Sequence, residues 1–481
     1  MSKAGRRIPL TIQCLLFNLI SLGNAQAQFR PQQPAVSYPP QLVSGLTALR
    51  DAALTSDYAQ REVAHLTENI GPRLGGSPQA EFAVQHVAEE LRKLGLAVQL
   101  EEVRVRHWVR GIETGELVKY PGQAPATIQK LALTALSGSS STPADGITAE
   151  AVVVTSFAEL KALGRTKVAG KIVLFNVSFD QRKAAAGYAS EAYGEAVVYR
   201  VLGAKTAAEL GAVASLIRSV GGADYRLPHT GFSISAGIPS GALASEDADL
   251  IAHLCAQGPV QIHLTLTPQT LPDVVSHNVI ADLKGSEYPE QIVVVSGHLD
   301  SWDLGRGAID DAAGVAVAME TANLMQQLHL RPKRTIRVIA WMDEENGGRG
   351  NETYAKDFAA ELRNHAAAIE SDLGAGHPMG YVAKASPALI NLLQPMLEVM
   401  RASGANAVRS VEYSPGSDIE PLVRAGVPGF APLQDVRTYF NYHHTAADTL
   451  DKIVPRELQE NAAAMAVLAY TLANLPPPLP R

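Results

Sequence analysis

Three short apolar runs, each followed by side chains that can bind a metal, constrain this sequence more than any other feature. The runs begin at residues 291, 335 and 366, and they lead to His298, to the pair Glu344-Glu345 and to Asp372. Such runs, separated by stretches with helical spacing, are typical of buried strands in a parallel α/β sheet. In such a sheet the ligand binds outside the carboxyl ends of the strands. Imidazole and carboxylate groups at these ends form the mixed set that zinc accepts, so the sequence predicts a hydrolytic metal site.

The residues that follow His298 strengthen this prediction. Asp300, two residues later, can orient the imidazole through its second nitrogen, as carboxylates near metal-bound histidines often do. A glycine-rich loop then carries the adjacent acids Asp310 and Asp311 into a helix predicted over residues 315–328. One of these acids can cap the helix, and the other is then a candidate for a bridging metal ligand.

Two further pairs follow along the chain. Consecutive side chains at a strand end point in different directions, so one of Glu344 and Glu345 can bind a metal while the other faces the attacking water as a general base. The adjacent His443 and His444 lie in a loop with aromatic neighbours, where histidines rarely fill a core. Such a set suits two metals that share a carboxylate at a separation of about 3.5–4 Å. Three ligand carboxylates against two dications leave a net charge of about +1, which favours a bound hydroxide at neutral pH.

Composition and charge narrow the function further. The chain has 481 residues, of which 46% are apolar and 19% are charged, so it can bury the cores of two or three domains. Its formal net charge of −7 and the lack of a basic run argue against nucleic acid as a partner.

The N-terminus predicts export. Basic residues precede an apolar stretch over residues 8–22, and Ala25-Gln-Ala27 provides a small-x-small cleavage signal. Together they indicate a signal peptide over residues 1–27 and a secreted or periplasmic protein. Polar residues interrupt the apolar stretch, which is too short to span a bilayer comfortably, so no stable membrane anchor is expected. After residue 27 the chain keeps only Cys255, which excludes an intrachain disulfide.

Changes in composition divide the chain into parts. Residues 28–44, rich in proline and glutamine, predict a linker, and two amphipathic helices are expected between residues 45 and 96. The breaker cluster at 137–143 is a boundary candidate. Short strands and helices without metal-type endings then alternate to about residue 266. The expected organisation is a main domain over 45–139 and 269–475, an inserted domain over 140–268 and a frayed tail over 476–481.

The glycine-rich segment also resembles a known family. Residues 297–314, Gly-His-Leu-Asp-Ser-Trp-Asp-Leu-Gly-Arg-Gly-Ala-Ile-Asp-Asp-Ala-Ala-Gly, resemble the signature of the co-catalytic dizinc exopeptidases, which include bacterial leucyl aminopeptidase and glutamate carboxypeptidase. The order of the metal-type residues and the ending Tyr-His-His-Thr-Ala-Ala-Asp-Thr at 442–449 carry the match. It covers about residues 45–475, and within the family the chain is most similar to the carboxypeptidase Q group.

The resemblance implies a fold and a set of metal ligands. The fold is an α/β zinc-exopeptidase fold with a mainly parallel central sheet flanked by helices. The insert is expected to be a protease-associated domain, because residues 170–175 and 238–247 resemble its strands. One zinc ion would be held by His298 and Asp372 and a second by Glu345 and His444, with Asp310 as the bridge.

The resemblance also implies catalytic roles. Glu344 would be the general base, with a metal-bound hydroxide as the nucleophile. His444 is preferred to His443 because the family's ligand lies four residues before an acid, here Asp448. His443 would then support the site without binding metal. A cis peptide between Asp310 and Asp311 is a further family feature.

The implied activity is hydrolysis of dipeptides or short peptides with free termini by an exported dizinc exopeptidase. An aminopeptidase that releases N-terminal residues is the alternative. A receptor-like homologue without activity would lack zinc ligands, and glutaminyl cyclases carry no such insert, so both fit less well.

End-specificity depends on the group that anchors the free terminus. The candidates are Ser417, Asp418 for an α-amine and Arg437 for a carboxylate. The insert is expected to lie over the strand ends and to restrict access to short substrates. The resemblance also implies that the chain can assemble as a homodimer.

Overall fold

The structure, a computed structural model, describes residues 36–222 and 225–481. The predicted signal peptide over residues 1–27 lies outside these residues. Helix α1 (Pro40–Ala53) begins inside the predicted linker, so the expected linker end at residue 44 is wrong. Proline favours this start because its missing N–H is not needed in a first helical turn. Across the described ranges, no helix is both long and apolar enough to cross a membrane.

Eight strands form the first sheet, with a mainly parallel centre. Their spatial order is β1 (Ala97–Val109), β10 (Gln269–Leu283), β12 (Arg334–Trp341), β11 (Tyr288–His298), β13 (His365–Glu370), β16 (Gly429–Gln434), β14 (Pro378–Lys384) and β15 (Ala407–Ser410). The central strands β12, β11, β13 and β16 are parallel. The predicted mainly parallel α/β sheet is confirmed.

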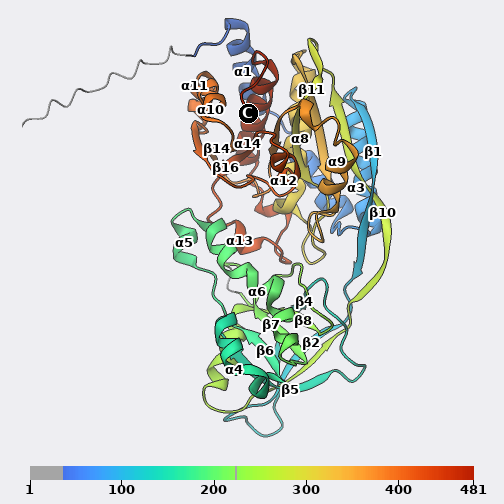
Figure 1. Cartoon of the computed structure of the whole chain (residues 1–481), viewed down its shortest axis with the longest axis vertical. Helices are drawn as coiled ribbons and strands as arrows, with labels where there is room; N and C mark the ends of the chain where they lie inside the picture. The colour runs from blue at the N-terminus through green and yellow to red at the C-terminus, as the bar shows by residue number, and fades with distance from the viewer. Residues whose placement is uncertain (1–35, 223–224) are drawn as a thin grey trace, which may run out of the picture. The chain divides into compact units, whose positions relative to one another are not determined.

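Helices cover both faces of this sheet (Figure 1). Val293 and Val295 of β11 belong to a core with α1, α2 (Tyr58–Ala64), α3 (Pro78–Lys93), α8 (Ala313–Gln327) and α14 (Pro455–Asn474). Ile292 and Val294 belong to a second core with α9 (Arg349–Asp357) and α12 (Glu420–Arg424). Two cores form because successive side chains of a strand point to opposite faces of the sheet. Further helices of this part are α10 (Pro387–Leu392), α11 (Gln394–Met400) and α13 (Tyr439–Tyr442).

The helices before β1 differ in number from the prediction. The sequence predicts two helices between residues 45 and 96, whereas the structure has α1, α2 and α3, with a π-helical extension of α2 over His65–Ile70. The helical pattern breaks at Thr55 and Ser56, since hydroxyl side chains compete for backbone hydrogen bonds. Helix α3 agrees with the second of the helices expected before residue 96 and is capped by Ser77.

The second sheet also has eight strands. Their spatial order is β3 (Gln129–Leu131), β2 (Glu113–Lys119), β9 (Gln261–Leu266), β5 (Ile147–Val154), β6 (Ile172–Phe175), β7 (Ala214–Arg218), β8 (Ser240–Leu243) and β4 (Leu133–Ala135). Its helices are α4 (Phe157–Val168), α5 (Gln181–Ala185), α6 (Ala189–Glu209) and α7 (Ser245–Cys255). Because β2, β3 and β4 precede residue 140, the second sheet starts earlier than the insert boundary expected there.

The breaker cluster at 137–143 explains this difference. Ser137 forms a bridge with Phe232, and Gly138 has a φ of 83°. The cluster therefore marks a turn inside the second sheet's region, since glycine and serine favour turns as readily as linkers. Strands β1 and β10 connect the two regions, and they pair antiparallel from Ala97↔Asp282 to Val109↔Gln269 (Figure 1).

The C-terminal tail is packed, which corrects the expected fraying. Leu479 is buried, and the Arg481 guanidinium donates to the carbonyl oxygens of Arg363 and His365 at 2.7 and 2.9 Å. The prolines of the tail end helix α14 but do not prevent these contacts.

Candidate metal centre

The metal-type residues meet at the carboxyl ends of neighbouring strands. Strand β11 lies between β12 and β13 and ends at His298, Glu344 and Glu345 follow β12, and Asp372 follows β13. Nε2 of His298 lies 3.1 Å from Oδ1 of Asp310 and 3.1 Å from Oδ1 of Asp372. The parallel order of the strands therefore brings together residues that are far apart in the sequence.

Asp310 lies between this group and a second one. Its Oδ2 atom is 3.4 Å from Nε2 of His444, and the same nitrogen is 3.0 Å from Oε2 of Glu345. One carboxylate thus faces two groups, His298 with Asp372 and Glu345 with His444. This is the arrangement in which a carboxylate bridges two metals, and the individual ligand roles stay predictions.

The chemistry of the cluster fits a bound cation. Oδ2 of Asp310 and Oε1 of Glu345 are buried and have no hydrogen-bond partner among the described residues. Burial, together with the charge of Asp310, raises the pKa of Glu345 well above its ordinary value. An unpaired buried carboxylate is costly unless a proton or a cation neutralises it. Potential ligand atoms of His298, Asp310 and Glu345 lie within 4.8 Å of one another, and this nitrogen and oxygen set suits zinc.

Asp311 supports the backbone of the site. Its Oδ2 accepts the N–H of His298 at 3.0 Å, and its Oδ1 accepts the N–H of Gly314 at 2.9 Å, at the start of helix α8. A Cβ atom on Gly297 or Gly314 would lie 2.6 or 2.3 Å from Oδ2 of Asp311, so both positions need glycine. Asp311 thus accepts an N–H of the first turn of α8, whose N-cap residue is Ala312. The peptide between Asp310 and Asp311 is cis, as the resemblance implies.

Asp300 acts differently from its predicted role. Nδ1 of His298 lies 3.0 Å from the backbone carbonyl oxygen of Asp300 and 3.9 Å from its carboxylate. The carboxylate instead accepts the backbone N–H groups of Glu344 and Glu345 at 3.2 and 3.3 Å. Asp300 therefore orients the imidazole through its main chain and the glutamate pair through its side chain.

Two buried residues hold the glycine-rich loop. Oδ1 of Asp448 accepts the N–H groups of Ala308 and Ile309, both at 2.8 Å. Arg73 is fully buried and donates to carbonyl oxygens on both sides of the loop, including Leu299 at 2.9 Å and Gly307 at 3.0 Å. Sequence reasoning missed Arg73, because nothing in its local pattern separates it from a surface arginine.

The two adjacent histidines stack, with ring centroids 3.6 Å apart, but contact different groups. Nε2 of His443 lies 3.6 Å from Oδ2 of Asp310, and its Nδ1 has no partner in the described part of the chain. Nδ1 of His444 lies 3.2 Å from the carbonyl oxygen of Thr230. Nη1 of Arg200 lies 3.1 Å from the same Nδ1. With its proton on Nδ1, His444 would donate to this carbonyl and leave Nε2 available for a metal. Nε2 faces both Asp310 and Glu345, which favours His444 as the ligand.

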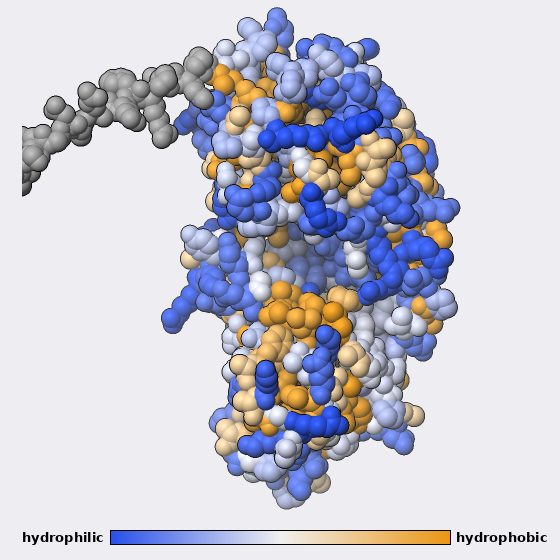
Figure 2. All heavy atoms as spheres, viewed as in Figure 1, coloured by the Kyte–Doolittle hydropathy of each residue, from blue (hydrophilic) through white to orange (hydrophobic). Residues whose placement is uncertain are grey.

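A cavity of about 370 Å³ opens onto the cluster. It is lined by Ser190, Tyr193, Arg200, Asp310, Glu344, Glu345, Asp372, Leu373, Tyr439, Phe440, His443 and His444. Ser190, Tyr193 and Arg200 come from α6 of the second sheet's region, so both regions form the cavity. Figure 2 shows a hollow beside α6, with hydrophobic residues gathered at its edge.

Arg200 is the lining residue that sequence reasoning missed. Its side chain is 7% exposed, Nη1 donates to the Tyr193 hydroxyl at 2.8 Å, and Nε has no partner. Within residues 36–222 and 225–481 it forms no ion pair with an acid. Gly231 makes room for it, since a Cβ atom there would lie 2.4 Å from Cζ of Arg200. A lone arginine inside the apolar stretch 196–203 is the signal that could have found it.

The predicted anchoring residues have different outcomes. The Ser417 hydroxyl donates to Oδ2 of Asp372 at 3.2 Å, so it lies beside the cluster. Asp418 is fully buried and does not line the cavity, which argues against binding of an α-amine. Arg437 is exposed and forms a forked ion pair with Asp435, so the structure does not bring it to the site.

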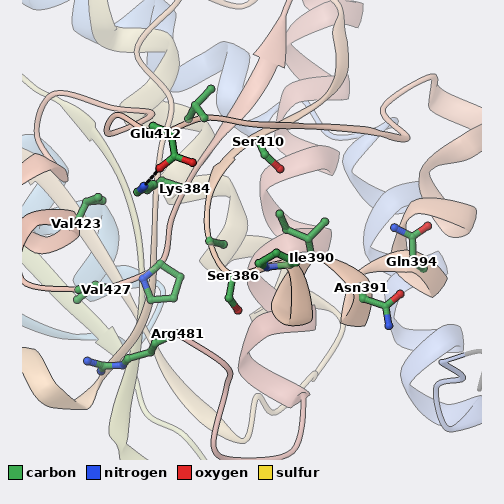
Figure 3. A pocket seen from close by; sticks show the side chains of 15 residues that line it. Lys384, Ser386, Ile390, Asn391, Gln394, Ser410, Glu412, Val423, Val427 and Arg481 are labelled. Carbon is green, nitrogen blue, oxygen red and sulfur yellow. Dashed lines mark hydrogen bonds and ion pairs between the residues drawn. The ribbon is translucent and has the colours of Figure 1, made fainter. Parts of the chain in front are cut away.

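A second cavity lies away from the cluster (Figure 3). It has a volume of about 630 Å³ and lies beside β14, α10 and the C-terminus. Lys384 and Glu412, which line it, form an ion pair with each other. Because the charges of Lys384 and Glu412 neutralise each other and no residue of the metal cluster lines the cavity, we assign no chemistry to it.

Known proteins share both the sequence and the architecture. The model of peptidase family M28 matches residues 278–469. Carboxypeptidase Q of Homo sapiens is 37% identical over 87% of this chain and 86% of that protein, and carboxypeptidase Q of Bos taurus is 35% identical over 95% and 94%. The crystal structure of a peptidase M28 precursor from Shewanella amazonensis SB2B has a TM-score of 0.85 at 37% identity, covering 92% of this chain and 99% of that chain.

More distant structures share the fold alone. An aminopeptidase from Aneurinibacillus sp. strain AM-1 has a TM-score of 0.64 at 23% identity, covering 91% of this chain and 99% of that chain. The predicted zinc-exopeptidase fold and the enzyme prediction are confirmed, whereas the protease-associated identity of the insert stays a prediction. With relatives of this identity and coverage, the chain belongs to peptidase family M28 and is a metallopeptidase.

Proposed function

We propose that this chain is an exported zinc exopeptidase, with two zinc ions per chain, that recognises short peptides by their free C-terminal carboxylate. The observation that carries the proposal is Arg200, a buried cation without an acidic partner that lines the same cavity as the metal cluster. The carboxypeptidase Q relatives support the same direction of cleavage by their names.

A substrate carboxylate would give Arg200 the partner that the chain itself does not supply. The planar guanidinium fork matches a carboxylate in two parallel hydrogen bonds. Nη1 of Arg200 lies 3.1 Å from Nδ1 of His444, whose opposite nitrogen faces Glu345. The guanidinium is therefore separated from the cluster by about the width of one imidazole ring. A carboxylate held there places the bond of the last residue near the cluster.

The alternative, an aminopeptidase, needs an acid that is free to hold an α-amine. The acids that line the cavity are Asp310, Glu344, Glu345 and Asp372. Asp310, Glu345 and Asp372 are predicted metal ligands, and Glu344 is the proposed base. No acid that lines the cavity is therefore left to bind an α-amine. This difference favours recognition of the carboxylate end.

The chain's own residues supply the proton chemistry. Burial, together with the charges of nearby acids including Asp372, raises the pKa of Glu344 to about 7, against the opposing effect of His298. A base with a pKa near neutrality can both accept and return a proton at the scissile bond. Asp300 fixes the backbone of Glu344 and so aims its carboxylate. Zinc bound to the cluster would polarise the scissile carbonyl and lower the pKa of water.

The dimensions of the cavity favour short substrates. Its volume of about 370 Å³ lies near the lower end of the roughly 300–1,000 Å³ that is typical of ligand pockets. Ser190, Tyr193 and Arg200 form the wall contributed by α6. Kinetics on a length series from dipeptide to about ten residues should show the highest kcat/KM for the shortest peptides.

The test compares free and blocked termini. Amidation of the C-terminus should lower kcat/KM by about 10–100-fold or more, because charged hydrogen bonds contribute roughly 1.5–3 kcal/mol. Arg200→Gln should lower kcat/KM for free peptides by a similar factor and abolish the preference over amides. Arg437→Gln is the matched control and should leave both values unchanged.

Other results would overturn the proposal. Loss of activity on acetylating the N-terminus, with amidation tolerated, would make the chain an aminopeptidase. Cleavage inside a doubly blocked peptide would make it an endopeptidase. Elemental analysis of the purified protein checks the two zinc ions, and the mass of exported material checks the predicted new N-terminus at Gln28.

A further inference from the structure

The predicted metal ligand His444 is held by the second sheet's region. Nδ1 of His444 lies 3.2 Å from the carbonyl oxygen of Thr230, and the N–H of Thr230 donates to the carbonyl oxygen of His444 at 2.9 Å. Thr230 is fully buried. His444 has a φ of 62°, a left-handed conformation that a non-glycine residue keeps only where its surroundings enforce it. The two hydrogen bonds to Thr230 are such a constraint.

Thr230 is in turn fixed by Arg110, which lies between β1 and β2. Nη2 of Arg110 donates to the Thr230 hydroxyl at 3.1 Å. The same guanidinium donates to Oδ2 of Asp303 through Nε at 2.8 Å and to Oδ1 through Nη2 at 2.5 Å. Asp303 belongs to the glycine-rich loop that follows His298. Arg110 therefore joins the loop of the first sheet to the segment that holds His444.

The remaining donors of Arg110 bind the second sheet. Nη1 donates to Oε1 of Glu113 at 2.7 Å and to the carbonyl oxygen of Ala135 at 2.9 Å. With these contacts every N–H of the guanidinium has an acceptor, which only the planar fork of arginine allows. A lysine, with one ammonium group, could not reach these acceptors together.

A second route leads from Arg110 to the same histidine. The guanidinium lies over the ring of Trp108, with Cζ 4.8 Å from its centroid. Trp108 packs edge-on against Trp302 at 6.4 Å, and Trp302 packs edge-on against His444 at 5.6 Å. Both tryptophans are buried. The imidazole is thus held by the edge-on contact with Trp302 and, at Nδ1, by Thr230 and Arg200.

We propose that Arg110 is a positioning residue for the metal site: through Thr230, Asp303 and the two tryptophans it fixes the orientation of the His444 imidazole. This inference rests on the proposed function, in which Nε2 of His444 binds zinc. The ring nitrogen opposite a metal usually donates to a protein acceptor, and loss of such an acceptor weakens metal binding about 10–100-fold. Here the acceptor comes from the other sheet's region, and Arg110 keeps it in place.

The test measures metal affinity in the full-length holoenzyme. Arg110→Lys keeps the positive charge but removes the branched set of N–H donors. The affinity for one of the two zinc ions, measured by competition with a chelator, should fall about 10–100-fold. The absorption bands of the Co²⁺-substituted enzyme should shift as well, because they report ligand geometry. The matched control is Arg218→Lys, since the Arg218 side chain is 14% exposed against 13% for Arg110 and pairs with Asp249 and Asn176 rather than with a predicted metal ligand. The control should keep wild-type affinity and bands.

The outcomes separate this inference from the proposed function. If Arg110→Lys and Arg218→Lys both keep wild-type zinc affinity and Co²⁺ bands, the positioning role is wrong. If His444→Ala also retains both ions, the ligand assignment itself fails. If Arg110→Lys does not fold, Asp303→Asn replaces it, because this variant weakens the paired hydrogen bonds between Arg110 and Asp303. The expected loss of zinc affinity and the expected shift of the Co²⁺ bands are the same. Loss of stability without loss of zinc affinity in either variant would overturn the proposal.

Discussion

Both sheets contain a run of parallel strands, but their carboxyl ends carry different residues. In the first sheet these ends lead to His298, to Glu344 with Glu345, and to Asp372. In the second sheet β5, β6, β7 and β8 are also parallel. These strands lead to Thr155, Asn176, Ser219 and Ala244.

The difference teaches that topology provides a place and the residues provide the chemistry. In the second sheet the polar groups near the strand ends satisfy one another, as when Asn176 donates to Asp249 at 3.3 Å while Asp249 also pairs with Arg218. In the first sheet Asp310 and Glu345 keep buried oxygens without partners. The second sheet's region contributes Arg200 to the cavity beside the cluster and holds His444 through Thr230.

The largest expected effect comes from Glu344, the proposed base, which follows β12. Glu344→Gln removes a proton acceptor and no predicted ligand, so activity should fall by about 10²–10⁴-fold, and by more if the carboxylate also orients the water, while both metals stay bound. Glu159→Gln is the counterpart after β5, where the carboxylate accepts the N–H of Thr155 at 2.7 Å, and it should leave activity unchanged. Peptidase assays with elemental analysis check both variants. Substantial activity in Glu344→Gln would place the base elsewhere.

A smaller effect separates the two adjacent histidines. His444→Ala should lose about one zinc ion per chain and nearly all activity, because Nε2 of His444 faces both Asp310 and Glu345. His443→Ala should keep its metal and lose less activity. Metal content and kcat measured side by side decide this point. Equal zinc loss in both, or the reverse order, would contradict the geometry.

The smallest effect tests buried charge away from the strand ends. Burial raises the pKa of Glu320 in α8 to about 7, so the folded chain binds a proton more tightly than the unfolded chain does. Its contribution to the free energy of unfolding therefore falls as pH rises from about 4.5 through 7. Glu320→Gln should gain roughly 2–3 kcal/mol over the wild type between pH 5 and pH 8.

Denaturant unfolding at both pH values measures this change. Glu209→Gln, at the exposed end of α6, is the control and should change the free energy of unfolding by less than about 0.5 kcal/mol at either pH. A pH-independent effect of Glu320→Gln would show that its carboxyl is not buried in the way the structure shows.

Local patterns predicted the elements that carry the cluster. The apolar runs before His298, Glu344 and Asp372 became β11, β12 and β13, since burial on both faces leaves a clear signature in sequence. Helix α8 follows from its apolar stretch and glycine-rich start. The expected domain boundary at 137–143 was misplaced because a turn and a linker share the same residue types.

The supports of the site could not be predicted in this way. Arg73, Arg110, Arg200 and Thr230 act through contacts with residues that are far away in the chain, and their neighbours in sequence reveal none of these contacts. Asp300 was identified as a supporting residue, but which of its oxygens faces His298 depends on backbone geometry. Arg437 was a candidate by its position in sequence, and its pairing with Asp435 removes it.

The pairing of β1 with β10 also bears on the modular construction of the chain. Val109 and Gln269 are direct partners in this pairing, so the residues between them leave and re-enter the first sheet side by side. Antiparallel partners can be joined by a short hairpin turn. Such a turn between Val109 and Gln269 could therefore replace the whole segment between them, which we call the cassette, without moving the backbone of the first sheet. Chemically the cassette is not separable, because its removal would take away Arg200 and the carbonyl that holds His444. The first sheet would keep its shape and lose a wall of its own active site.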